Sequence, residues 1–184
     1  MSFDTQDINK TRVDLKKFDE IWLFGYGSLI YKVDFPILES KDALIHDWQR
    51  RFWQGSHDHR GTPESPGRVL TLHYKPGATC EGVAYRVTQE IFEFLDHREK
   101  NGYLRHEVPI HFIDGSSRVG VIYIADEDND AYLGPAPDID IASHIQRSHG
   151  PSGPNPKYVT ELARALRSKG FHDDHVFAIE ALLD

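Results

Sequence analysis

The chain has 184 residues, of which 39% are hydrophobic and 27% charged, and its formal net charge is -8. This length suits one domain with a sizeable core. The acidic excess disfavours nucleic acid or an anionic membrane surface as a partner, because phosphate groups are bound by a basic excess. No apolar run approaches the roughly 18 residues that span a bilayer, and residues 1–20 lack the zones of a signal peptide, so we expect a cytoplasmic protein.

The N-terminal quarter of the chain leads into an apolar strand and a glycine-containing turn. Residues 1–19 lack sustained periodicity and predict an extended or frayed lead-in. Residues 21–25 are typical of a strand buried on both faces. In Gly25-Tyr26-Gly27-Ser28 the glycines permit positive φ and close approach of a ligand, and the following amides can point at an anion. A motif of this kind, taken alone, is more often a tight turn between two core segments.

In the rest of the chain, most of the predicted strands come first and most of the predicted helices come last. Residues 55–67 are polar and rich in glycine, serine and proline, which predicts a loop. The further predicted strands are residues 46–53, 68–74, 80–87, 104–113 and 118–125. The predicted helices are residues 89–100, 139–149, 158–168 and 173–183, and the third of them places Val159, Leu162, Ala163 and Leu166 on one apolar stripe. Turns are predicted at residues 75–77 and, between two strands, at Asp114-Gly115. About six strands before a group of helices indicate an α+β domain whose sheet can curl into a barrel.

The first predicted helix carries the clearest chemical signal. Phe92, Leu95 and Glu99 fall on one stripe of a 3.6-residue helix, so Glu99 faces the core side. Burial and the negative end of the helix dipole should both raise the pKa of this carboxyl group, which makes it a candidate base near neutral pH. The competing interpretation is an ion pair with Arg98 or Arg105 that ties the helix to the sheet.

Other reactive side chains give weaker signals. Cys80 is the only cysteine, which excludes an intrachain disulfide, and we interpret it as structural. The pairs His57/His59 and His172/His175 lack a third ligand at metal spacing, so we expect no metal site. The turn after the first strand matches neither the Gly-x-Ser-x-Gly elbow of hydrolases nor a dinucleotide-binding fingerprint.

A series of short motifs runs from about residue 21 to the C-terminus. They are Phe24-Gly25-Tyr26-Gly27-Ser28-Leu29-Ile30, Arg50-Arg51-Phe52-Trp53-Gln54-Gly55-Ser56, Asp58-His59-Arg60-Gly61, Pro66-Gly67-Arg68-Val69, Gly82-Val83-Ala84-Tyr85-Arg86, Leu95-Asp96-His97-Arg98-Glu99-Lys100-Asn101-Gly102-Tyr103, Tyr132-Leu133-Gly134-Pro135-Ala136 and Gly150-Pro151-Ser152-Gly153. In this order the motifs resemble those of the ChaC-type γ-glutamylcyclotransferases, which act on glutathione. Residues 1–20 look like an extension, and residues 21–184 look like the cyclotransferase domain.

The resemblance implies a small mixed β-barrel with surrounding helices. It also implies that Glu99 is the catalytic glutamate and that the backbone amides of Tyr26-Gly27-Ser28-Leu29 hold the γ-glutamyl group. Tyr103 and Tyr132 are candidate supports for the substrate. Glu90 falls where some family members carry a second glutamate, but its place on the polar face of the helix argues against a role.

The implied reaction cleaves glutathione to 5-oxoproline and cysteinylglycine through attack by the substrate's own α-amine, and it needs no metal or cofactor. Two alternatives stay open: cyclotransfer on other γ-glutamyl amino acids or γ-glutamylamines, and a non-catalytic module that binds glutathione. A buried Glu99 disfavours the binding module, because a binder of an anionic tripeptide gains little from a desolvated carboxylate. The sequence does not address the oligomeric state.

Overall fold

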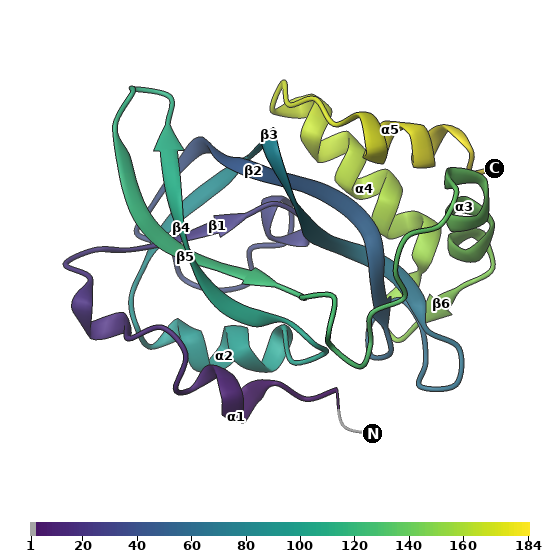
Figure 1. The fold of residues 1–184 in the computed structure, drawn as a ribbon, viewed down its shortest axis with the longest axis horizontal. Helices are drawn as coiled ribbons and strands as arrows, with labels where there is room; N and C mark the ends of the chain where they lie inside the picture. Colours follow the sequence, from purple (N-terminus) through teal and green to yellow (C-terminus); the bar gives the residue numbers. More distant parts are fainter. Residues whose placement is uncertain (1–2) are drawn as a thin grey trace.

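Five strands form a closed barrel in the computed structural model, which describes residues 3–184 (Figure 1). The strands follow the order β1-β3-β2-β4-β5 around the barrel. Their bounds are β1 (Ile21–Gly25), β2 (Glu39–Ser56), β3 (Gly67–Val87), β4 (Leu104–Phe112) and β5 (Ser117–Ile124). Strand β1 pairs antiparallel with β3 and closes the barrel by a parallel contact with β5 at Leu23 and Val121. The predicted mixed barrel of the α+β class is confirmed.

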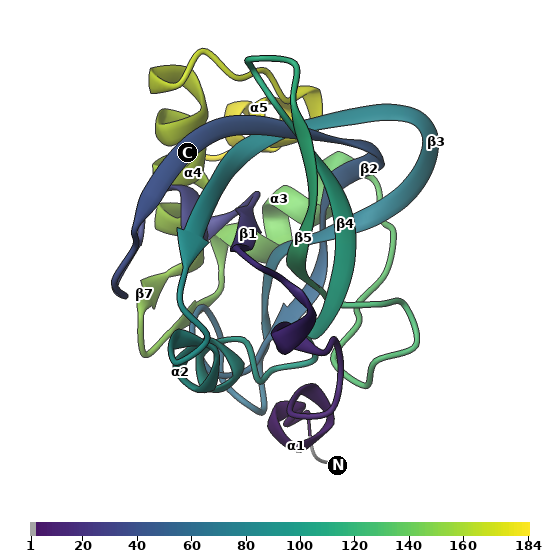
Figure 2. The ribbon, with the colours of Figure 1, turned by 90° about the vertical axis from the view of Figure 1, so that its left-hand side faces the viewer.

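Strands β2 and β3 are longer than the sequence predicts, and together they form one curved ribbon (Figure 2). The turn predicted over residues 75–77 is instead an irregularity within β3. Gly77 has a φ of +87°, and its N–H donates to the carboxylate of Asp47 (2.8 Å), which itself has a φ of +70°. The pairing register shifts between His46 and Trp48. The ladder continues past this bulge, so the predicted strands 68–74 and 80–87 are one strand.

The helices gather in two places. Both views show α3, α4 and α5 together on one side of the barrel and α1 and α2 away from them (Figures 1 and 2). The bounds of the helices are α1 (Gln6–Asn9), α2 (Ile91–Arg98), α3 (Asp138–Gln146), α4 (Asn155–Ser168) and α5 (Asp174–Ala181). Two 3-10 turns are η1 (Leu15–Lys17) and η2 (Ser28–Ile30), and β6 (His149–Gly150) pairs with β7 (Gly153–Pro154). Among residues 3–184, no helix combines the length and the apolar character needed to cross a lipid bilayer.

The N-terminal segment is ordered against the barrel, so the prediction of an extended or frayed lead-in is wrong for its described residues. Thr5 is 8% exposed and Asn9 is fully buried, and both bond to the chain around residues 100–105. Residues 3–12 are anchored by polar side chains and main-chain bonds, whereas Val13, Leu15 and Phe18 after them pack in or against the core. Sequence periodicity detects an apolar stripe and cannot detect this kind of anchor.

Candidate active site

Two adjoining pockets lie at the end of the barrel where β1 and β5 finish and β3 and β4 begin. The turn pocket, of about 340 Å³, is lined by residues 26–29 together with Phe24, Leu70 and Tyr123. The loop pocket, of about 620 Å³, is lined by residues of the loop between β2 and β3, among them Asp58, His59 and Arg60. The side chains or backbone that line both pockets belong to Ser28, Glu99, Tyr103 and Tyr158.

The glycines of the turn provide space rather than an unusual backbone conformation. Neither Gly25 nor Gly27 has a positive φ, so that part of the sequence interpretation is wrong. A Cβ on Gly25 would lie 2.9 Å from the Cβ of Leu29, and a Cβ on Gly27 would lie 3.4 Å from the Tyr158 hydroxyl. The turn can therefore fold tightly beside Leu29 and leave the face of Gly27 open toward the turn pocket.

Buried side chains hold the carbonyl groups of the turn from the barrel side. The guanidinium of Arg50, 1% exposed, donates from Nε to the Tyr26 carbonyl (2.6 Å). The hydroxyl of Tyr85 donates to the Leu29 carbonyl (2.6 Å). Within residues 3–184, the amide N–H groups of Ser28 and Leu29 donate to no acceptor, as expected for the first residues of a helical turn. The turn thus presents donors to the pocket.

Glu99 follows the last residue of α2 and lies between the two pockets. Its N–H donates to the Leu95 carbonyl (2.8 Å), and it shares a stripe with Phe92 (1% exposed) and Leu95 (0% exposed), as predicted. Its side chain is 15% exposed. The pKa of the Glu99 carboxyl is raised to about 7. Burial is the largest cause, the charge of Arg98 opposes it, and the charges of Asp58 and Asp34 add to it. A carboxyl group with this pKa can both take and give a proton near neutral pH.

The two proposed ion-pair partners of Glu99 behave differently. Arg105 pairs with Asp96 (2.5 and 2.9 Å), so the alternative that joins it to Glu99 is wrong. The Nε of Arg98 does lie 3.5 Å from the Glu99 carboxylate. The same guanidinium also donates to Asp34 (2.6 Å), so its charge is shared. Glu99 is therefore a largely buried carboxylate next to one guanidinium that it shares with Asp34, and not half of a tight ion pair.

The remaining sequence candidates lie in different places. Tyr103 lines both pockets, and its hydroxyl donates to the Leu70 carbonyl. Tyr132 lies outside both pockets and pairs with Gln54 in an isolated β-bridge. Glu90 is exposed at the start of α2 and also lies outside both pockets. The structure therefore brings Tyr103, but not Tyr132, to the same place as Glu99.

Sequence reasoning missed several side chains that line the pockets. Tyr158 accepts a hydrogen bond from the Leu70 N–H (3.3 Å). It begins the apolar stripe of α4, and its helical spacing from Leu162 is the sequence pattern that could have predicted its burial. The hydroxyl of Tyr31 is buried against the loop pocket and has no partner within residues 3–184. His59 and Ser152 also line this pocket, at 3.2 Å from each other.

Cys80, His172 and His175 line neither pocket. No three His, Cys, Asp or Glu side chains among residues 3–184 are placed to hold a metal ion. His172 lies beside Asp174 (2.5 Å), and His175 accepts a hydrogen bond from the Phe52 N–H (3.1 Å). Cys80 is 2% exposed, and burial raises the pKa of its thiol to about 11.

Comparisons with known proteins point to one family. The family model described as ChaC-like protein matches residues 21–184. The chain is 46% identical over 169 residues to γ-glutamylcyclotransferase 2-3 of Arabidopsis thaliana, which covers 85% of this chain and 84% of that protein. It is 42% identical over 174 residues to glutathione-specific γ-glutamylcyclotransferase 1 of Danio rerio, with 89% and 88% covered. A crystal structure of a glutathione-specific γ-glutamyl cyclotransferase from yeast superposes with a TM-score of 0.83 at 32% identity, covering 89% of this chain and 95% of that one.

Proposed function

Because the chain belongs to the ChaC-like protein family, we propose that it is a glutathione-specific γ-glutamylcyclotransferase in which Glu99 moves the proton. The reaction converts glutathione to 5-oxoproline and cysteinylglycine. The observation that carries this assignment is the position of Glu99, with a carboxyl pKa raised to about 7, between the turn pocket and the loop pocket.

The reaction is an intramolecular acyl transfer. The α-amine of the γ-glutamyl group attacks the γ-carbonyl carbon, so a bond to the α-nitrogen forms and the amide bond to cysteine breaks. The α-amine is largely protonated near neutral pH, because its reference pKa is roughly 8. The α-nitrogen loses two protons in all, one before it attacks and one as the lactam forms, and the departing amine of cysteinylglycine gains two. Glu99 takes each proton from the α-nitrogen and passes it to the departing amine, which returns the carboxylate to its starting state.

The pockets suit the two parts of glutathione. We place the γ-glutamyl group in the turn pocket, where the free N–H groups of Ser28 and Leu29 can hold its α-carboxylate. Cysteinylglycine extends into the loop pocket, which is the larger of the two. Folding the flexible γ-glutamyl chain so that its own amine meets its carbonyl can contribute on the order of 7 to 11 kcal/mol to lowering the barrier.

The test of this function is the variant Glu99→Gln, which keeps the shape of the side chain but cannot accept a proton. We expect the variant to bind glutathione and to lose about 10²- to 10⁴-fold in kcat, measured as release of 5-oxoproline and cysteinylglycine. Glu90→Gln is the matched control, since it removes the same charge from an exposed residue outside both pockets, and it should keep full activity. A near-native rate for Glu99→Gln would refute the assigned role.

The substrate range is tested with the same assay. Comparing product release from glutathione and from γ-glutamylalanine separates a glutathione-specific enzyme from a general one. The loop pocket favours the tripeptide, because γ-glutamylalanine lacks the glycine and the thiol that would extend into this pocket. Equal kcat/KM for the two substrates would contradict glutathione specificity. Calorimetric binding of glutathione by the wild type without turnover would indicate a binding module instead.

We place this reaction in the cytoplasm. The chain has a single cysteine, which is unpaired and buried, as is usual in a reducing compartment. Fractionation of cells that carry the tagged protein tests this placement, and recovery in a membrane or secreted fraction would contradict it.

A further inference from the structure

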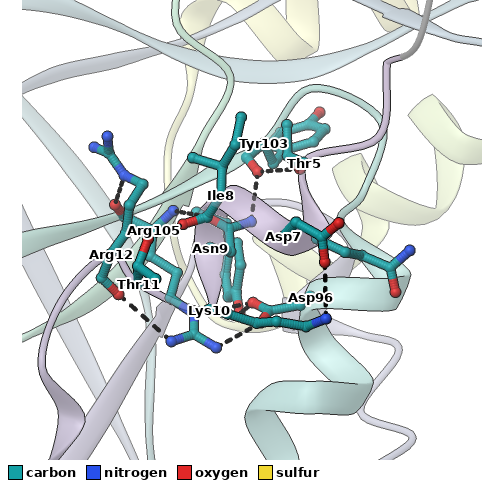
Figure 3. Close-up of polar contacts among 12 residues, drawn as sticks. Thr5, Asp7, Ile8, Asn9, Lys10, Thr11, Arg12, Asp96, Tyr103 and Arg105 are labelled. Carbon is teal, nitrogen blue, oxygen red and sulfur yellow. Dashed lines mark hydrogen bonds and ion pairs between the residues drawn. The ribbon is translucent and has the colours of Figure 1, made fainter.

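Residues 3–12, here called the N-terminal segment, run along the connection between α2 and β4, residues 99–103 (Figure 3). The Thr5 N–H donates to the Lys100 carbonyl (2.9 Å), and the Gly102 N–H donates to the Phe3 carbonyl (2.9 Å). These main-chain bonds fix the path of the connection that carries Glu99 at one end and Tyr103 at the other.

Two buried polar side chains of the segment converge on the carbonyl of Tyr103 (Figure 3). The hydroxyl of Thr5 lies 2.8 Å from this oxygen, and the Nδ2 of Asn9 lies 3.0 Å from it. The Oδ1 of Asn9 also accepts the N–H of Arg105 (2.9 Å). Arg12 donates from Nε to the Arg105 carbonyl (3.0 Å). Buried polar groups that are fully bonded in this way rigidify the chain that they contact.

The connection is held from its other side by the barrel. Gln54 of β2 donates to the Asn101 carbonyl (2.9 Å), and the Asn101 side chain donates to the Gly55 carbonyl (2.7 Å). The ring of Phe3 stacks on His57 at 4.1 Å, immediately before the part of the loop that lines the loop pocket. The connection therefore lies between β2 and the N-terminal segment, and the segment also contacts the second wall of the site.

We propose that the N-terminal segment sets the position of Glu99 and Tyr103 for proton transfer, with Thr5 and Asn9 as positioning residues. The proposal rests on the function given above. The match to the family model begins at residue 21, so these contacts come from residues 3–12, within the predicted extension (1–20) of the domain at 21–184. The main chain of the segment and the side chains of Thr5 and Asn9 act on Glu99 and Tyr103 through the connection, and small displacements of catalytic groups have large effects on rate.

The test changes one hydroxyl group, since deleting the whole segment would also uncover the buried Arg105. Thr5→Val removes the hydroxyl, which lies 2.8 Å from the Tyr103 carbonyl oxygen and 3.1 Å from that of Lys100, and keeps the shape of the side chain. We expect kcat to fall about tenfold with KM for glutathione within about twofold of the wild type, because the loosened connection misplaces the proton-transfer group. Amide hydrogen exchange over residues 100–105 should become faster in this variant.

Two variants serve as controls. Thr5→Ser retains the hydroxyl and should restore both kcat and slow exchange. Thr11→Val removes an exposed hydroxyl that bonds only within the segment, to the Ile8 carbonyl (3.1 Å), and should match the wild type. Thr5→Val with the same kcat as Thr11→Val would overturn the proposal, even if its melting temperature were lower. A wild type that forms no 5-oxoproline would refute the proposed function, while faster exchange in Thr5→Val alone would still support the anchoring of the connection.

Discussion

The proton affinity of Glu99 is set by burial and by charges that come from three separate parts of the chain. Burial has the largest effect and raises the pKa to about 7. Arg98, next in sequence, lowers the pKa, whereas Asp58 from the β2–β3 loop and Asp34 from the segment after η2 raise it. Substituting one neighbour should therefore move the pKa without touching the carboxyl group itself.

The variant Asp58→Asn tests this balance. Glu99 must be ionised to accept a proton, so turnover should rise with pH through the pKa of about 7. Asp58→Asn removes an anion that raises this pKa, so the rising limb of the pH–rate profile should move to lower pH by a fraction of a pH unit. The exposed Asp19→Asn is the control and should leave the limb in place. A limb that moves to higher pH in Asp58→Asn would contradict the electrostatic account.

For single residues, the sequence predicts which face of a helix a side chain occupies, but it does not predict which distant loop residues approach it. The 3.6-residue period places Glu99 beside Phe92 and Leu95 and keeps Glu90 on the outside, because both statements depend only on local helix geometry. The approach of Asp58 depends on the folding of a loop, which no local pattern encodes. The same limit explains Tyr132, whose motif resembled the family but whose side chain lies outside both pockets.

The turn after β1 is held in shape by hydrogen bonds from side chains of two neighbouring strands, β2 and β3. Arg50 of β2 holds the carbonyl of Tyr26, and Tyr85 of β3 holds that of Leu29. The held carbonyls fix the peptide planes that join Tyr26 to Gly27 and Leu29 to Ile30, because each peptide group is a rigid plane. The free amides of the turn lie between these two fixed planes. The strands therefore determine how well the turn can bind an anion.

Tyr85→Phe removes the bond to Leu29 and leaves a buried carbonyl without its donor. We expect a loss of about 1–3 kcal/mol in the free energy of unfolding. The KM for glutathione should rise several-fold, measured with the 5-oxoproline assay, because the turn loses one of its two anchors. Tyr74→Phe in the same strand is the control, since Tyr74 is 57% exposed. An unchanged KM in Tyr85→Phe would show that Arg50 alone positions the turn.

The sequence predicts where a helix or a turn lies better than it predicts whether a strand continues past an irregularity. The apolar stripe of α4 and the turn at Asp114-Gly115 appear where expected, because each depends on neighbouring residues. Lys75-Pro76-Gly77 resembles a turn, yet β3 continues through it because Asp47 on the facing strand accepts the Gly77 N–H. That acceptor is far away in sequence, so the local pattern alone could not reveal it.

The molecule as a whole depends on a barrel that closes tightly around β1. Gly82 lies against this strand, and a Cβ added there would be 2.4 Å from the Gly25 carbonyl and 2.6 Å from the Phe24 ring. Gly82→Ala should therefore lower the free energy of unfolding by about 1–3 kcal/mol, as overpacking usually does. Urea denaturation measures this loss, with the exposed Ser40→Ala as the control. Equal urea midpoints for the two variants would mean that β1 and β3 can move apart at Gly82 without a loss of stability.

The class of the fold followed from the order of strands before helices and from the resemblance to a known family. The closure of the barrel did not follow from local patterns, since the parallel contact of Leu23 with Val121 joins distant parts of the chain. Periodicity identifies faces and turns, but it contains no information about which strand edges meet.

The burial of Cys80 in β3 has a consequence for an enzyme whose substrate is itself a thiol. A mixed disulfide forms only when an accessible thiolate meets a disulfide. Cys80 is 2% exposed with a thiol pKa raised to about 11, and the chain has no other cysteine. Oxidised glutathione therefore finds no site for covalent attachment on this protein. Turnover should follow the concentration of the reduced tripeptide and not the redox potential of its pool.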